Sequence, residues 1–125
     1  MMKRPLSPHL QVYRLPVTAL VSITHRLTGL ALAVGTLMVL WWLLAAASGL
    51  EAYNTAMAFA RSPLGLFMLA GWSFAIYFHL LNGIRHLIWD TGRMFGISCA
   101  TQSAYMAVFI ALFLTILTWV CVYVF

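Results

Sequence analysis

The first residues whose types and spacing could do chemistry are Ser22, His25 and Arg26. They stand at i, i+3 and i+4, so on a helix they share one face. That face would offer a hydroxyl, an imidazole and a fixed positive charge, which together suit a polar or anionic ligand. Alternatively, Arg26 extends to lipid headgroups while Ser22 and His25 bond to neighbouring backbone. Gly29 follows one turn later, and its missing side chain permits close approach of a partner helix or a flat ligand.

The second group lies between Phe78 and Asp90, in the sequence FHLLNGIRHLIWD. It ends a long apolar run, where ionisable side chains are costly to bury and are therefore functional candidates. His79 is followed by Gly83 at i+4 and His86 at i+7, so all three project from one helix face. At about 1.5 Å of rise per residue, His79 lies roughly 16 Å deeper than Asp90. His79 is therefore the strongest candidate of the group.

A neutral imidazole at that depth, beside a glycine that leaves room for a planar group, suits an axial ligand of haem iron. Haem propionates need cations or hydrogen-bond donors near an interface, and His25, Arg26 and His86 are at suitable levels for them. The alternative is that His79 bonds to a neighbouring helix and binds no cofactor. Arg85 lies on another side of the helix from His86, and we expect it to meet lipid headgroups or a partner.

The composition identifies lipid as the surroundings of these groups. Hydrophobic residues make up 64% of the 125 residues and charged residues only 7%, against about 25% charged residues in soluble domains. Each uncharged segment is long enough to cross roughly 30 Å of hydrocarbon, which takes about 20 helical residues, and none alternates like a barrel strand. The sequence therefore predicts an all-α integral membrane protein with three transmembrane helices. The three segments without Lys, Arg, Asp or Glu are Leu27–Leu50, Ser62–Ile84 and Met94–Phe125.

We expect one membrane-anchor domain over residues 1–125. It begins with an extended, proline-punctuated arm at 1–16, which lies on the bilayer or docks on a soluble partner. The transmembrane helices are expected at about 18–49, 63–90 and 103–125.

The net charge of +5 reports membrane topology and not a nucleic-acid partner. Most basic residues lie before the first span or beside the exit of the second, which the positive-inside rule assigns to the inner side. The N-terminus is then inside and the C-terminus outside, and the connection at 50–61, of mixed composition, lies outside. No targeting peptide is visible, which favours a bacterial inner membrane, with the N-terminus in the cytoplasm, over a mitochondrial one. The basic residues concerned are Lys3, Arg4, Arg14, Arg26, Arg85 and Arg93.

The two polar groups together resemble a known family. The first contains S-x-x-H-R-x-x-G, from Ser22 to Gly29, and the second contains H-x-x-x-G-x-R-H-x-x-x-D, from His79 to Asp90. Both motifs, in this order and within a three-span chain, are similar to those of the succinate dehydrogenase cytochrome b556 family. These proteins are the large membrane anchors of succinate:quinone oxidoreductases.

The resemblance implies a set of partners and roles. The partners are a flavoprotein subunit, an iron-sulfur subunit and a second small membrane anchor subunit, which completes the helical bundle. His79 is implied as one axial ligand of haem b, shared with the second anchor. Ser22 and Arg26 are implied as ubiquinone-site residues, and His25, Arg26 and His86 as surroundings of the haem propionates. Succinate oxidation itself would belong to the partners, because nothing in this chain matches a flavin or succinate site.

Two alternatives remain open at the level of sequence. The chain could anchor a fumarate reductase, since the direction of electron flow depends on cofactor potentials that the sequence does not report. It could also be a structural anchor without haem, whose histidines only pack. A transporter subunit is a weak third option, because no acidic residue lies at mid-membrane.

Overall fold

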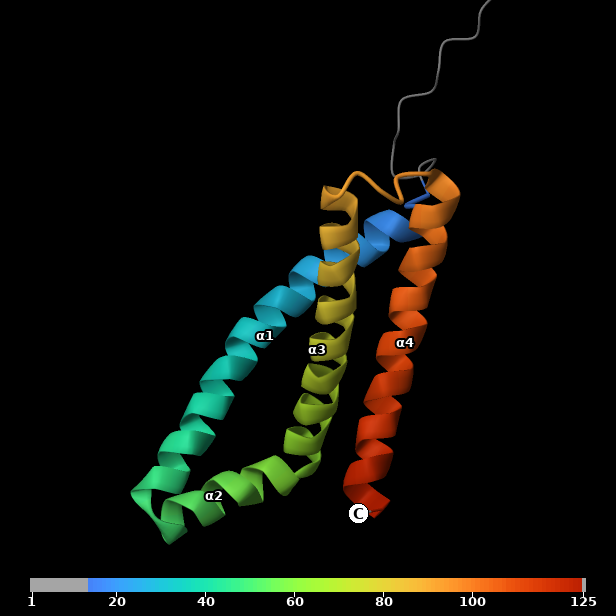
Figure 1. Cartoon of the computed structure of the whole chain (residues 1–125). Helices are drawn as coiled ribbons and strands as arrows, with labels where there is room; N and C mark the ends of the chain where they lie inside the picture. Colours follow the sequence, from blue (N-terminus) through green and yellow to red (C-terminus); the bar gives the residue numbers. More distant parts are fainter. Residues whose placement is uncertain (1–13, 125) are drawn as a thin grey trace, which may run out of the picture.

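The structure, a computed structural model, describes residues 14–124 of the chain (Figure 1). All regular secondary structure in this part of the chain is α-helical, and it contains no strand. Three of its helices are long and apolar enough to cross a membrane, which confirms the predicted fold class. All but the last residues of the predicted arm at 1–16 lie outside the described residues. The helices are α1 (Val17–Ser48), α2 (Leu50–Arg61), α3 (Pro63–Asp90) and α4 (Ile97–Val124).

Backbone chemistry accounts for where these helices begin and end. Pro16 precedes α1 in an extended conformation, with a φ of −66°. Gly49 separates α1 from α2 and has a φ of 118°, a backbone conformation that residues other than glycine rarely adopt. Ser62 caps α3, because its hydroxyl oxygen accepts a hydrogen bond of 3.1 Å from the backbone N–H of Gly65. Pro63 occupies the first turn, where its missing N–H costs nothing.

The connection between the first two spans is more ordered than its mixed composition suggested. It forms α2, which runs across the end of the molecule and joins α1 to α3 (Figure 1). Glu51 in its first turn and Arg61 in its last turn complement the helix dipole. Ala56 is buried against the neighbouring helices. At the opposite end, α4 begins at Ile97, earlier than the predicted 103.

Helices α3 and α4 lie side by side, whereas α1 crosses them near one end and then diverges (Figure 1). The main core cluster lies at the crossing and contains Val21 of α1, Phe78 of α3, and Ala104 and Ala111 of α4. The alanines of α4 allow its backbone to approach α3 closely. We call the crossing end the basic end, because four arginines lie there: Arg14 before α1, Arg26 near the start of α1, Arg85 near the end of α3 and Arg93 in the α3–α4 connection.

The remaining surface is apolar, as expected for helices in lipid. Large hydrophobic side chains are exposed along all three spans, since lipid rather than protein covers them. The divergence of α1 from α3 leaves an open cavity of about 810 Å³, which we call the α1–α3 cavity. Its lining is drawn from α1, α2 and α3 and includes Val34, Trp41, Met57, Met68 and Trp72.

Candidate functional site

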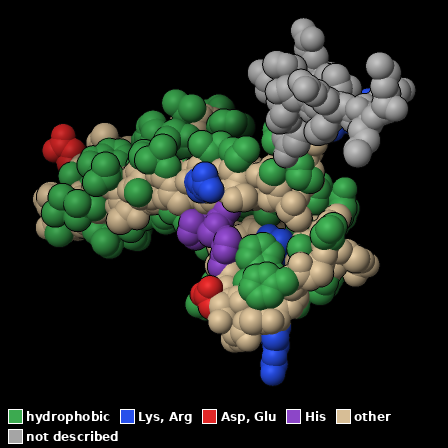
Figure 2. Space-filling model, turned by 90° about the horizontal axis from the view of Figure 1, so that it is seen from above, with side chains coloured by type: hydrophobic (Ala, Val, Ile, Leu, Met, Phe, Trp, Pro, Cys, Tyr) green, Lys and Arg blue, Asp and Glu red, His purple; other side chains and the backbone are tan. Residues whose placement is uncertain are grey.

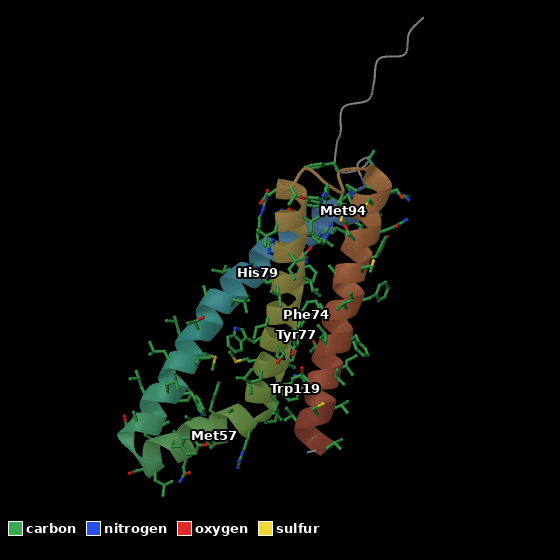
Figure 3. All side chains as sticks on the ribbon, in the orientation of Figure 1. Met57, Phe74, Tyr77, His79, Met94 and Trp119 are labelled. Carbon is green, nitrogen blue, oxygen red and sulfur yellow. The ribbon has the colours of Figure 1, made fainter. Side chains whose placement is uncertain are left out.

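His79 projects from α3 toward α1 in the half of the molecule nearer the basic end (Figure 3). Its Nδ1 atom lies 3.1 Å from the backbone carbonyl oxygen of His25 and 3.3 Å from Oγ1 of Thr28. Both partners belong to α1, so the ring bridges the helices at their crossing. The sequence singled out His79 as a candidate but did not identify Thr28 as its neighbour.

Three histidines form one cluster. The ring of His25 lies 4.1 Å from that of His79 and 5.3 Å from that of His86, measured between ring centroids. Figure 2, which looks down from the basic end, shows the histidine side chains gathered as a single group between α1 and the α3–α4 pair. His86 also meets the ring of Trp89 edge-on, at 5.0 Å. The predicted shared face of His79 and His86 is therefore confirmed, because both reach the same histidine of α1.

One atom of this cluster has no partner within the described part of the chain. Nε2 of His25 is buried and forms no hydrogen bond there. Buried polar atoms in folded proteins are nearly always hydrogen-bonded, so such an exception needs an explanation. An orphaned imidazole nitrogen beside two further imidazoles points to a ligand or a partner chain that supplies the missing group.

The two glycines of the motifs play different parts. A Cβ atom at Gly29 would lie 3.1 Å from Cε1 of His79, so the gap at Gly29 is filled by the His79 ring. Of the two expected neighbours, a partner helix or a flat ligand, the structure shows a helix, because the ring belongs to α3. A Cβ atom at Gly83 would meet nothing within 4 Å. The flank of α3 one turn from His79 is therefore open, as the spacing predicted.

Ser22 and Arg26 lie on α1 together with His25. Ser22 is partly buried and Arg26 is exposed at the basic end. Their i, i+4 spacing on a continuous helix places them on one face. A hydroxyl and a guanidinium therefore project from the same face of α1, near its start.

The structure contradicts the expectation that Arg85 meets lipid headgroups or a partner. Its side chain is only 8% exposed. Its guanidinium donates hydrogen bonds to Oδ1 of Asn82, to Oγ of Ser103 at 3.1 Å and to the carbonyl oxygen of Ala100 at 3.2 Å. It also lies over the ring of Trp89. The expectation was wrong because α4 packs on that side of α3 and supplies the acceptors.

Metal-ligand chemistry within the chain is limited. Across residues 14–124, no group of three or more His, Cys, Asp or Glu side chains is arranged to hold a metal ion. Cys99 and Cys121 are both free thiols.

The fold and the site define a class of protein: a helical membrane subunit with three spans and a histidine cluster at the crossing of two of them. The chain belongs to the succinate dehydrogenase/fumarate reductase transmembrane subunit family, whose model matches residues 1–118.

Similar proteins carry a consistent name. The chain is 43% identical to the succinate dehydrogenase cytochrome b556 subunit of Paracoccus denitrificans, over 98% of this chain and 94% of that protein. It is 40% identical to the subunit of the same name from Rickettsia felis, over 94% of this chain and 92% of the relative. The mitochondrial succinate dehydrogenase cytochrome b560 subunit of Sus scrofa is 35% identical, over 92% of this chain and 67% of its own length.

Proposed function

We propose that this chain is the large membrane anchor of a succinate dehydrogenase, that it binds haem b, and that it helps to form the site at which ubiquinone is reduced. The observation that carries the proposal is the position of His79, held between two spanning helices with Nδ1 bonded and an open flank beside it. The cytochrome names of the relatives support it. Their succinate dehydrogenase names favour succinate oxidation over fumarate reduction as the physiological direction.

The residues present fit a haem. His79 would supply a nitrogen ligand to the iron, and the open surface at Gly83 leaves space for a flat macrocycle against α3. The unpartnered Nε2 of His25 is suited to bind a propionate, with Arg26 and His86 as further donors near the basic end. Once bound, the haem would accept and release single electrons between the iron-sulfur subunit and the quinone. A further ligand to the iron would come from the second anchor subunit.

Ubiquinone reduction would take place beside Ser22 and Arg26. A hydroxyl can donate a hydrogen bond to a quinone carbonyl, and a fixed guanidinium stabilises negative charge as it develops on that oxygen. The exposure of Arg26 at the basic end gives access to water, so the protons for reduction need not cross the bilayer. The apolar quinone tail would remain in lipid.

The shape of the chain suits an incomplete bundle. The α1–α3 cavity, of about 810 Å³, is open and apolar, and the second anchor subunit would complete the bundle on this side. The basic end would face the cytoplasm of a bacterium under the positive-inside rule. The iron-sulfur and flavoprotein subunits would then dock at that end, near the proposed quinone site.

The haem assignment is tested by the optical spectrum of the purified complex. His79→Ala should abolish the low-spin b-type absorbance, because His79 is the one iron ligand that we propose for this chain. Ser73→Ala serves as the control, because Ser73 lies on the same helix, donates its hydroxyl to the carbonyl of Leu69 and has no part in the proposed haem site, and it should retain the absorbance. An unchanged spectrum in the His79 variant would refute the assignment.

The quinone assignment is tested by comparing two activities of the same membranes. Arg26→Leu should lower succinate-dependent quinone reduction roughly 10- to 100-fold, the equivalent of one lost hydrogen bond to a charged group at about 1.5–3 kcal/mol. Ser22→Ala should lower it less. Reduction of an artificial dye by the soluble subunits should be unaffected, and Arg14→Leu, outside the spans, should change neither activity. Equal loss of both activities would show failed assembly and would count against a quinone role.

A further inference from the structure

Two groups of α1 meet at Nδ1 of His79. The carbonyl oxygen of His25 lies 3.1 Å away and Oγ1 of Thr28 lies 3.3 Å away. The same Thr28 hydroxyl donates a hydrogen bond of 2.9 Å to the carbonyl oxygen of His25. Thr28 is only 7% exposed, so water does not compete for these contacts. The result is a closed triangle of an imidazole nitrogen, a hydroxyl and a carbonyl.

The triangle determines which nitrogen of His79 carries the proton. A carbonyl oxygen only accepts hydrogen bonds, so Nδ1 must donate to His25. The one hydroxyl hydrogen of Thr28 is already donated to that same carbonyl, so the oxygen of Thr28 also acts as an acceptor toward Nδ1. The proton therefore resides on Nδ1, and in the neutral ring Nε2 keeps its lone pair. In the opposite tautomer, the lone pair of Nδ1 would face the oxygen lone pairs of the His25 carbonyl and the Thr28 hydroxyl in a buried site. That tautomer would be less stable by about 1–3 kcal/mol.

We propose that Thr28 is a positioning residue for His79: its hydroxyl, together with the carbonyl of His25, holds the imidazole in the Nδ1–H tautomer and in one ring plane, with Nε2 presented as the ligand atom. The inference rests on the proposed haem-binding function. Metal-binding histidines generally require such an outer partner, and its loss typically weakens metal binding about 10- to 100-fold. Gly29, the next residue on α1, also contributes, because the His79 ring fills the space its side chain would take.

The chain contains a matched control for the hydroxyl. Thr36 lies on the same helix and donates a hydrogen bond of 2.9 Å to the carbonyl of Leu32, much as Thr28 does to His25. Thr36 is exposed, and within residues 14–124 its hydroxyl forms no hydrogen bond to a histidine ring. Replacing either threonine by valine keeps the shape of the side chain and removes the hydroxyl.

The experiment uses the purified complex, normalised to its flavin content, with four variants: Thr28→Val, Thr28→Ser, Thr36→Val and His79→Ala. The first readout is the rate at which ferric haem is lost to an excess of apomyoglobin. The second is the largest g-value of the low-spin ferric haem in its electron paramagnetic resonance spectrum, which responds to the orientation of axial imidazole planes. Thr28→Val should lose haem about 10-fold faster and show a shifted g-value. Thr28→Ser and Thr36→Val should match the parent in both.

The outcomes separate this inference from the function on which it rests. If His79→Ala keeps low-spin haem, the ligand assignment fails and the inference fails with it. If His79→Ala loses the haem but Thr28→Val matches the parent in both readouts, the inference alone is overturned. It is also overturned if Thr28→Ser is as defective as Thr28→Val, because the hydroxyl would then not be the group that matters.

Discussion

Replacing Arg85 by leucine should destabilise the packing of α3 against α4. Arg85 is buried in a membrane-spanning helix and bonds to Asn82 on its own helix and to Ser103 and Ala100 on α4. Leucine fills part of the space but donates nothing. Asn82, which is 1% exposed, then keeps a buried carbonyl oxygen that has lost its donor.

The size of the effect follows from these contacts. Hydrogen bonds inside membrane proteins contribute about 0.6 kcal/mol on average, and bonds to charged groups in soluble proteins about 1.5–3 kcal/mol. The variant loses the three hydrogen bonds of the guanidinium but no longer pays the desolvation penalty of a buried charge. The net loss of stability should be roughly 2–4 kcal/mol. Arg85→Leu combined with Asn82→Leu should cost less than the sum of the single changes, because the second change removes the orphaned acceptor.

The measurement is a heating assay on the detergent-solubilised complex, in which the tagged chain that remains soluble is quantified. The midpoint is the temperature at which half of that chain has been lost from the soluble fraction. At about 4 °C per kcal/mol, the Arg85 variant should lose roughly 8–16 °C. Arg93→Leu is the control, because Arg93 is an exposed arginine of the α3–α4 connection, and its midpoint should stay within about 2 °C of the parent. Equal midpoints for the Arg85 and Arg93 variants would refute the reasoning, since a side chain that contacts only lipid headgroups would give that result.

Two further predictions concern the packing of α3 and use the same heating assay. A Cβ atom at Gly65 would lie 2.7 Å from the carbonyl oxygen of Ala60, and because backbone cannot move aside cheaply, Gly65→Ala should cost about 1–3 kcal/mol. Gly71→Ala, where nothing lies within 4 Å, should be neutral or stabilising, so a Gly65 variant as stable as that control would contradict the prediction. Tyr77 donates to Oγ1 of Thr118 at 2.7 Å, and Tyr77→Phe should lower stability by only about 0.6 kcal/mol; a loss as large as that of a core truncation would mean that this hydroxyl has another role.

Much of the fold could be predicted from hydropathy alone, because a spanning segment in lipid must satisfy its own backbone hydrogen bonds and therefore becomes a helix. The helical period also predicted correctly that His79, Gly83 and His86 share a face. Helix α2 was missed because a short amphipathic segment between spans has a mixed composition. Its dipole-complementary ends, Glu51 and Arg61, were a signal that could have revealed it.

The site could be predicted only in part, and Arg85 illustrates why. Its place on the helix relative to His86 was read correctly, but which neighbour covers that side depends on how α4 packs. The same limit applies to Thr28, whose sequence position next to Gly29 carries no indication of a contact with His79. Contacts of this kind require the register and the crossing angle of two helices, and these are set by close packing over their whole length.

The sequence by itself determined that the chain is a three-span membrane protein, that its polar chemistry is confined to two stretches, and which residues within each stretch share a face. These properties follow from local composition and from the helical repeat. Only the tertiary structure decided that the His79 ring fills the space at Gly29, that its Nδ1 meets Thr28 and the His25 carbonyl, and that Arg85 joins α3 to α4. Those facts depend on residues far apart in the chain, and the packing of one helix on another brings them within bonding distance.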